Sequence, residues 1–325
     1  MPRTRSPRRG SMQFWPRKRA KSMLARIRCW AKTKDTKPLC FAGYKVGMTH
    51  MIITDNRPNA ITKGEDISWP VTIIECPPIK VAGIVFYRQT LYGPCTSSLI
   101  LAEKLDKELG RTMPLPKKQK KIEEIKPEDY SEIMLLVHTQ PKLTGIGKKK
   151  PELFELAIGG EHLASQLEYA KKVLGKEISL TDVFVEGQQT DIHTITKGKG
   201  YQGPVKRFGV AIRSHKSEKT KRGPGNIGPW HGTDYNRVAH AGQMGFHQRT
   251  DYNKIILKIS DKTEEINAKG GFIRYGVIKN KYLLVKGSIS GPPKRLIKIT
   301  MAVRPNKKIF THAPAIVYIS QEAKQ

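Results

Sequence analysis

The sequence predicts a mainly β protein: a small antiparallel barrel with an inserted α/β subdomain, a basic N-terminal arm and a long basic internal loop. Short β-branched runs bounded by turn residues recur in three separate stretches of the chain. The segment between the first two stretches is balanced in charge, and the excess positive charge lies in two segments without apolar periodicity. We therefore expect seven segments: a basic N-terminal extension (1–38), a first barrel segment (39–87), an inserted α/β subdomain (88–180), a second barrel segment (181–196), the long basic loop (197–253), a third barrel segment (254–303) and a C-terminal tail (304–325).

The N-terminal extension is an arginine-rich arm. Residues 1–37 carry 13 Lys and Arg against one acid, Asp35, and they lack the periodicity of a self-contained core. Phe14, Trp15 and Trp30 stand out, because a fully solvated tail rarely keeps large aromatic side chains. We expect these rings to stack on bases or to dock onto the body of the protein; a disordered basic tail is the alternative.

Three strand patterns predict the first barrel segment. Residues 44–53 form the first pattern, and a turn rich in Asp, Asn and Pro follows it. Residues 71–75 and 81–87 form the other two, with two consecutive prolines between them.

The inserted segment mixes helix and strand signals. A helix is predicted from the capping residue Ser98 to Gly110, with leucines at i, i+4 spacing between them. Residues 133–137 predict a short buried strand, and residues 161–174 predict the clearest helix of the chain. With 15 basic and 15 acidic residues over 101–186, this segment has the charge balance of an ordinary domain.

Strand patterns return after residue 180 and supply the rest of the barrel. They cover residues 183–185, 192–195, 255–259, 275–278, 282–285 and 296–301.

The charge of the whole chain points to a polyanionic partner. The 325 residues include 59 Lys and Arg and 28 Asp and Glu, a formal net charge of +31. Nucleic acid is the commonest polyanion dense enough to neutralise it. The four cysteines form no C-x-x-C pair, which predicts reduced thiols without zinc, and no apolar run is long enough to cross a bilayer. We expect a soluble intracellular protein without metal, cofactor, membrane partner or homo-oligomer.

The glycine-rich start of the long loop invites comparison with nucleotide-binding loops. Gly198, Gly200, Gly203 and Val205 match the pattern G-x-G-x-x-G-x-V. However, the residues after Gly203 do not favour a helix, and the acidic ribose ligand expected downstream is missing. H-R-D and D-F-G motifs are also missing, which disfavours a kinase.

The same loop suits an RNA backbone. Its glycines permit close approach, its cations neutralise phosphates and its aromatic rings can stack on bases. Its histidines lack metal-ligand spacing and suit phosphate, 2′-hydroxyl or base contacts. A flexible linker is the alternative. No catalytic or metal-binding residue is predicted, and the predicted RNA-binding residues are Arg3, Arg5, Arg8, Arg9, Trp15, Arg17, Lys18 and Arg19 of the arm and Lys197, Lys199, Tyr201, Lys206, Arg207, Phe208, Arg213, His215, Lys216, Lys219, Lys221, Arg222, Trp230, His231, Arg237, His247 and Arg249 of the loop.

Several motifs together resemble one family over nearly the whole chain. They are GSMQF (10–14), FAGYKVGMT (41–49), TKGKGYQG (196–203), GPGNIGPWH (223–231) and AGQMGFH (241–247). With these motifs the chain resembles the universal large-subunit ribosomal protein L-three family in its archaeal form.

The resemblance implies a six-stranded barrel of the translation-protein type, whose arm and loop enter large-subunit rRNA. It implies binding near the 3′ end of that rRNA, a role in early subunit assembly, and a loop tip with Trp230 near the peptidyl transferase centre. The implied partners are large-subunit rRNA and neighbouring large-subunit proteins, in a cytoplasmic, ribosome-bound protein. No enzymatic activity is implied, because RNA carries the ribosome's chemistry.

Two other function classes fit the sequence less well. An RNA-modifying or RNA-processing enzyme would need a positioned acid/base set or a cofactor loop, and the sequence has neither motif. A DNA-compacting protein would rarely need a large barrel with a neutral insertion.

Overall fold

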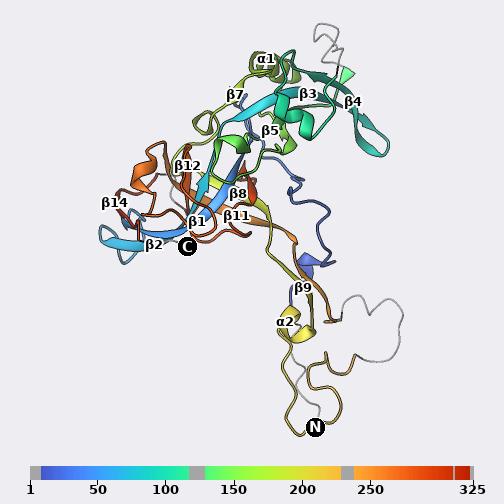
Figure 1. Cartoon of the computed structure of the whole chain (residues 1–325), viewed down its shortest axis with the longest axis vertical. Helices are drawn as coiled ribbons and strands as arrows, with labels where there is room; N and C mark the ends of the chain where they lie inside the picture. The colour runs from blue at the N-terminus through green and yellow to red at the C-terminus, as the bar shows by residue number, and fades with distance from the viewer. Residues whose placement is uncertain (1–8, 117–128, 228–237, 310–311, 323–325) are drawn as a thin grey trace. The chain divides into compact units, whose positions relative to one another are not determined.

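The structure is a computed structural model that describes residues 9–116, 129–227, 238–309 and 312–322 (Figure 1). The chain divides into two units. Unit 1 consists of Met1–Met23 and Ile195–Arg249, and unit 2 consists of Leu24–Thr194 and Thr250–Gln325. The fold is mainly β, as predicted, with several sheets.

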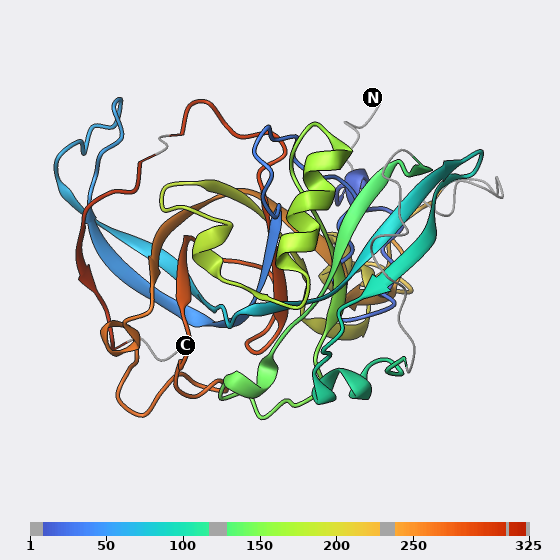
Figure 2. The same cartoon turned by 90° about the horizontal axis from the view of Figure 1, so that it is seen from above.

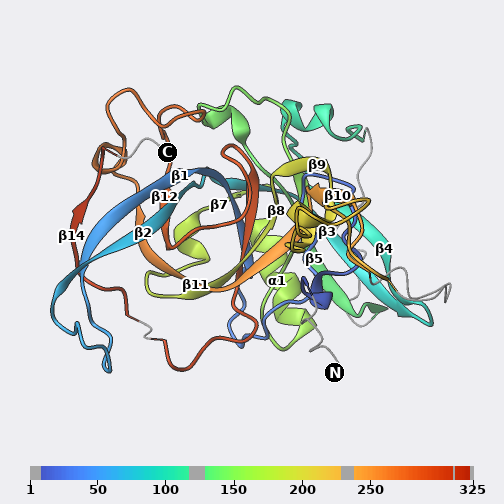
Figure 3. The same ribbon diagram turned by 90° about the horizontal axis from the view of Figure 1, so that it is seen from below.

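The main sheet of unit 2 is built from buried strands. Among the described residues it has seven strands in the order β13-β8-β11-β12-β2-β1-β14, and β1 also pairs with β13. Every residue of β8 and β13 is buried, as in strands covered on both faces, although β8 is largely polar in sequence. In Figure 3 the long strands of this sheet curve strongly. Their bounds are β1 Cys40–Thr54, β2 Asp66–Glu75, β8 Gln189–Ile195, β11 Gln248–Ser260, β12 Tyr282–Lys286, β13 Leu296–Met301 and β14 Ile316–Ile319.

Strand β1 organises the sheet because it is long enough to have several neighbours. Its first half pairs with β13, starting at Cys40 opposite Thr300. Its second half pairs with β14, starting at Met51 opposite Ile319. Along the other edge it pairs with β2 through most of its length, with an irregularity after Lys45.

A second sheet lies in the same unit. Within the described chain it has the order β4-β3-β5-β6, with β7 pairing to β3. The helix α1 (Leu163–Val173) buries Leu167 and Ala170 and runs beside β5, as Figure 2 shows. One continuous apolar core includes residues of both sheets, such as Ile299 of β13 and Leu135 of β5. The strand bounds are β3 Ile79–Thr90, β4 Gly93–Leu101, β5 Glu132–His138, β6 Leu153–Ala157 and β7 Glu177–Ile178.

Unit 1 has few regular elements. The strands β9 (Gly198–Gln202) and β10 (Gly242–Gly245) pair with each other, and the short helix α2 (Pro204–Phe208) follows β9. The remaining elements of the described chain are short 3-10 helices: η1 Met12–Phe14, η2 Lys107–Arg111, η5 Pro141–Leu143, η6 Leu180–Asp182 and η8 Thr263–Glu265.

Most predicted elements are confirmed, and three are wrong. The helix predicted from Ser98 to Gly110 is instead the end of β4 and the 3-10 helix η2, because residues up to Leu101 pair with β3. The strand predicted at 183–185 is irregular: Val183 and Phe184 are buried without pairing, after η6.

The strand predicted at 275–278 is also wrong. Phe272 and Gly276 form an isolated bridge there, so this segment is a tight turn. Tyr275 is buried because its hydroxyl donates a hydrogen bond to Glu75, a buried carboxylate. Of the apolar residues that predicted a strand, Tyr275 and Ile278 are buried outside any strand and Val277 is exposed.

Candidate nucleic-acid interface

The root of the long loop is a close pairing of two glycine-containing strands. Gln243 of β10 lies opposite Tyr201 of β9, and Gly245 lies opposite Gly198. Gly245 has a φ of 75°, and a Cβ there would lie 2.0 Å from the carbonyl oxygen of Lys197. Only glycine permits this approach. The glycines of the root therefore bring two backbones together.

A short helix follows the first of these strands, which corrects the expectation that none would form. Gly203 precedes α2, Pro204 occupies its first turn, and Gly209 ends it with a φ of 69°. Proline at the start and a left-handed glycine at the end are the usual helix boundaries. Of the β-branched residues that argued against a helix, Val205 lies within α2, whereas Val210 and Ile212 lie beyond Gly209. The helix has only five residues.

The N-terminal arm packs on α2 through the ring of Trp15. Trp15 stacks on Phe208, with ring centroids 5.8 Å apart and an interplanar angle of 30°. The guanidinium carbon of Arg17 lies 4.2 Å from the Phe208 centroid, and Arg17 donates from Nη1 to the carbonyl oxygen of Arg207 at 2.9 Å. Stacking and cation–π contact thus hold together segments that are far apart in the sequence.

Arg207 connects the helix to the second strand. Its Nε donates to the carbonyl oxygen of Gln243 at 3.0 Å, and its Nη1 donates to that of His240 at 2.9 Å. Burial lowers the pKa of the Arg207 guanidinium, which nevertheless stays charged because an arginine pKa starts so high. The Arg207 side chain therefore stabilises the fold of unit 1.

His247 contacts the arm at a second point, Lys18. Its Nδ1 lies 2.8 Å from the carbonyl oxygen of Lys18, and its backbone N–H donates to Thr196 Oγ1 at 3.1 Å. Burial lowers the pKa of His247, which favours a neutral ring with the proton on Nδ1. The N–H of Ala20 donates to the carbonyl oxygen of Phe246 at 2.8 Å, a contact that no local sequence signal indicated.

The predicted RNA-binding residues fall into three groups. Five are buried or half-buried in contacts within unit 1: Trp15, Arg17, Arg207, Phe208 and His247. Arg249 is half-buried too, with its guanidinium 4.4 Å from the Phe14 centroid. The exposed residues are Arg9, Lys18, Arg19, Lys197, Lys199, Tyr201, Lys206, Arg213, His215, Lys216, Lys219, Lys221 and Arg222. Arg3, Arg5, Arg8, Trp230, His231 and Arg237 lie outside the described residues.

A turn in the loop gathers several of the exposed cations. The N–H of Arg213 donates to the carbonyl oxygen of Lys221 at 3.1 Å, so the chain returns on itself between them. Lys219 has a left-handed backbone with a φ of 58°. Tyr201, on β9, is 77% exposed, which leaves its ring open to stack on a base.

The described residues of unit 1 are suited to binding a polyanion. They include 15 Lys and Arg residues and one acid, Glu218. Among all described residues, no group of three His, Cys, Asp or Glu side chains could hold a metal ion. No described helix has the length and apolar character needed to traverse a bilayer. The described surface of unit 1 offers cations, backbone exposed at glycines, and the exposed rings of Phe14 and Tyr201.

Comparison with known proteins identifies relatives along the full chain. A family model described as ribosomal protein L3 matches residues 1–122 and 117–325. The large ribosomal subunit protein uL3 of Methanosphaera stadtmanae is 48% identical and aligns with 100% of this chain and 99% of its own length. The proteins of that name from Archaeoglobus fulgidus and Methanococcus vannielii are 47% and 46% identical, each aligning with 98% of this chain and with 98% and 97% of their own lengths.

Proposed function

The chain belongs to the ribosomal protein L3 family, and from this premise we propose that it binds large-subunit rRNA through unit 1 as a structural constituent of the large ribosomal subunit. Members of this family are structural components of the ribosome, so the chain is not an enzyme. The relatives described above are named as proteins of the large ribosomal subunit. The proposed setting is the ribosome in the cytoplasm, with rRNA and neighbouring large-subunit proteins as partners and one copy of the chain per site.

The observation that carries the proposal is the docking of the arm on the loop root. Trp15, Arg17 and Arg207 hold unit 1 together. Two basic segments thereby become one body, in which the described residues include 15 Lys and Arg and a single acid. Without a polyanion, repulsion among these cations would oppose that arrangement.

The finer details of the proposal follow the family resemblance. We propose that six strands of the main sheet close into a barrel, which the pairing of β13 with both β8 and β1 supports. The division of the chain into seven segments, from the basic extension to the C-terminal tail, stays a proposal. The arm and loop would then bind near the 3′ end of the large rRNA, act early in subunit assembly, and bring Trp230, outside the described residues, near the peptidyl transferase centre.

The direct test is sedimentation from a lysate. The protein should sediment with the large subunit at moderate salt and be released by high salt or RNase, because phosphate contacts weaken steeply with salt. A free monomeric pool at moderate salt would contradict the proposal.

A charge-matched pair of variants tests the surface itself. Replacing Lys216, Lys219 and Lys221 by glutamine should lower the salt needed for release, since each lost phosphate contact reduces the salt slope by roughly 0.7–0.9. The control replaces Lys262, Lys269 and Lys279, exposed lysines of unit 2, in the same way. Equal effects of both triple variants would show that total charge, and not the unit 1 surface, governs retention.

The loop tip needs its own test. Trp230→Ala should leave the sheets folded and alter tRNA binding at the A-site side of the peptidyl transferase centre. Unchanged tRNA binding together with unchanged subunit assembly would argue against a positioning role for this residue.

A further inference from the structure

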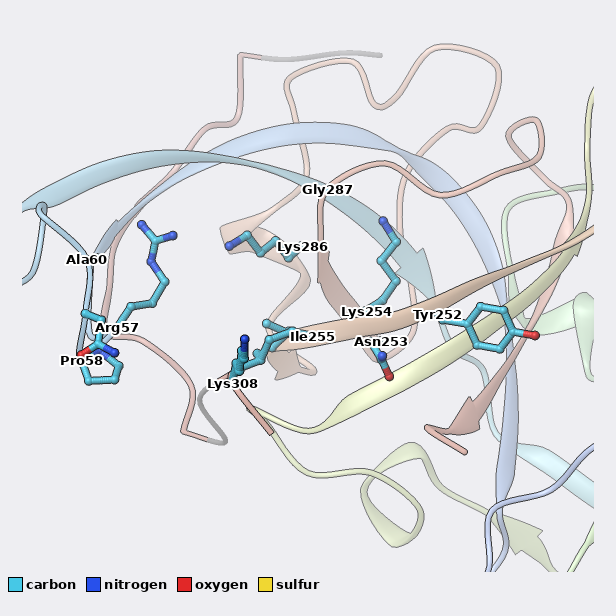
Figure 4. Close-up of a pocket in the computed structure, with 12 residues that line it drawn as sticks. Arg57, Pro58, Ala60, Tyr252, Asn253, Lys254, Ile255, Lys286, Gly287 and Lys308 are labelled. Atoms are coloured by element: carbon cyan, nitrogen blue, oxygen red, sulfur yellow. The ribbon is translucent and has the colours of Figure 1, made fainter. Parts of the chain in front are cut away.

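A cavity in unit 2 is lined by four cationic side chains. Its volume is about 580 Å³, and it lies where the turn after β1, the middle of β11 and the end of β12 meet. Arg57, Lys254, Lys286 and Lys308 line it. In Figure 4 the charged ends of Arg57, Lys286 and Lys308 point into the same space.

Only one of these cations has a carboxylate partner within the described residues. Arg57 donates from Nη2 to Asp55 Oδ2 at 2.7 Å and from Nε to Asp55 Oδ1 at 2.9 Å. That carboxylate also accepts a hydrogen bond from Thr62 Oγ1 at 2.7 Å, so its oxygens are engaged. None of the ion pairs in the described chain includes Lys254, Lys286 or Lys308.

Lys286 is held in place without being neutralised. Its ammonium lies 3.2 Å from the centroid of the Trp69 ring, and the Arg57 guanidinium lies 5.6 Å from the same centroid. Burial, with Arg57 nearby, lowers the pKa of Lys286 to about 8. A cation–π contact leaves the charge intact. An anion that entered the cavity would relieve the repulsion between the two cations.

The opposite side of the cavity offers a different chemistry. Tyr252 lines it with a side chain that is 61% exposed. Asn253 also lines it, and its buried Oδ1 has no hydrogen-bond partner among the described residues. The backbone of Asn253 is left-handed, with a φ of 53°, and its N–H donates to Asp191 Oδ1 at 2.9 Å. An exposed ring does not bind phosphate, but it offers a face on which a base can stack.

We propose that this cavity binds one nucleotide of an RNA strand, with its phosphate among Arg57, Lys286 and Lys308 and its sugar or base toward the exposed ring of Tyr252. A carboxylate from a protein neighbour would satisfy the cations but would leave the exposed Tyr252 ring unused. The cavity also has the size of a small-molecule site, larger than one carboxylate needs. The proposal rests on the rRNA binding proposed for the chain and adds a contact made by unit 2.

Lysine reactivity in the intact particle tests this proposal without any variant. Large subunits are treated with acetic anhydride, and acetylation of Lys286 and Lys308 is compared by mass spectrometry with that of Lys262 and Lys279. The cavity lysines should react about tenfold more slowly than in the free chain, as for a site that is largely occupied. Digestion of the particle with RNase should restore their reactivity, and ultraviolet irradiation should join Tyr252 to a nucleotide.

Three outcomes would overturn the proposal, and the first leaves the proposed function standing. The chain could sediment with the subunit while Lys286 and Lys308 stay fully reactive. Their protection could persist after RNase digestion, which would assign the cavity to a protein neighbour. On the free chain, AMP or inorganic phosphate could protect them while a short RNA does not, which would assign it to a free nucleotide or phosphate.

A double variant provides a second measurement. Lys286→Gln with Lys308→Gln should reduce the salt dependence of retention by about one phosphate contact, a slope change of roughly 0.7–0.9. Lys262→Gln with Lys279→Gln removes equal charge from exposed positions of the same unit. If both pairs change the slope equally, the cavity has no special role in binding.

Discussion

Unit 1 and unit 2 are each stabilised internally, and by different forces. In unit 2, whole strands are buried, and β12 contributes Tyr282, Leu283 and Leu284 with no exposed surface. Unit 1 buries few apolar side chains among its described residues and relies on Arg207, Phe208 and their backbone and ring contacts. Hydrophobic burial stabilises a unit without any binding partner, whereas a unit with a large excess of cations is stabilised when an anion binds to it. We therefore expect unit 2 to carry most of the stability and unit 1 to carry the proposed binding surface.

The largest expected effect is a core substitution in unit 2. Leu283 of β12 is fully buried and lies opposite Ile259 of β11 and Ile74 of β2. Leu283→Ala should lower the free energy of unfolding by about 2–5 kcal/mol, because it removes apolar contacts and leaves a cavity. Urea unfolding measures this, and Ile192→Val should cost about 0.5–1.5 kcal/mol as a milder control. A loss below about 1 kcal/mol for Leu283→Ala would mean that this core is not close-packed.

A pair of glycine substitutions tests the strand contact in unit 1. Gly200 and Gly245 both have positive φ, of 67° and 75°, but a Cβ at Gly200 would meet nothing within 4 Å. Gly200→Ala should therefore cost only the backbone strain, about 1–2 kcal/mol. Gly245→Ala should cost more, because its Cβ would collide with the carbonyl oxygen of Lys197. Hydrogen exchange of the β9 and β10 amides reports the difference, and equal protection in both variants would refute the close approach.

A smaller effect is expected at Arg207. Arg207→Met keeps much of the side-chain length but leaves the carbonyl oxygens of His240 and Gln243 without its hydrogen bonds. The local cost should be about 1–3 kcal/mol. Hydrogen exchange in unit 1 should rise while the urea midpoint of unit 2 stays unchanged, and Lys206→Met, exposed on the same helix, should do neither. A shift of the urea midpoint of unit 2 would contradict the prediction that Arg207 stabilises unit 1 alone.

The smallest expected effect is a pH dependence in unit 2. The pKa of Lys286 is about 8, against an ordinary value of 10.5. Between about these two values the unfolded chain binds more protons at this site, so the stability contributed by Lys286 rises with pH. Urea midpoints measured across the interval from about pH 8 to 10.5 should rise less steeply in Lys286→Met than in the wild type. Identical slopes would show that the folded environment does not disfavour the charged ammonium.

The sequence predicted elements well where burial and local pattern agree. Strands β12 and β13 are mostly apolar in sequence and are buried along nearly their whole length. Helix α1 has an apolar face and a glycine stop. The prediction from Ser98 to Gly110 failed because its leucine spacing also fits a strand edge followed by a 3-10 turn. Pairing with β3 decided between them, and that pairing leaves no local signal.

The sequence predicted the positive charge of the candidate site but not the contacts that its side chains make. Runs of Lys and Arg marked both basic segments of unit 1. No spacing rule could predict that Trp15 stacks on Phe208 or that Arg207 donates to carbonyl oxygens of a distant strand. The cavity in unit 2 is a similar case, because Arg57, Lys254, Lys286 and Lys308 come from four separate segments.

The docking of the arm also sets an order of events during synthesis. Arg17 and its acceptor Arg207 are 190 residues apart. At about 5–20 residues per second, the arm waits roughly 10–40 s before that acceptor is made. Throughout that interval its arginines and Trp15 lie on a nascent chain whose docking site has not yet been made, open to any polyanion or chaperone that arrives first. The region of the protein that is made earliest is therefore among the last to reach its folded position.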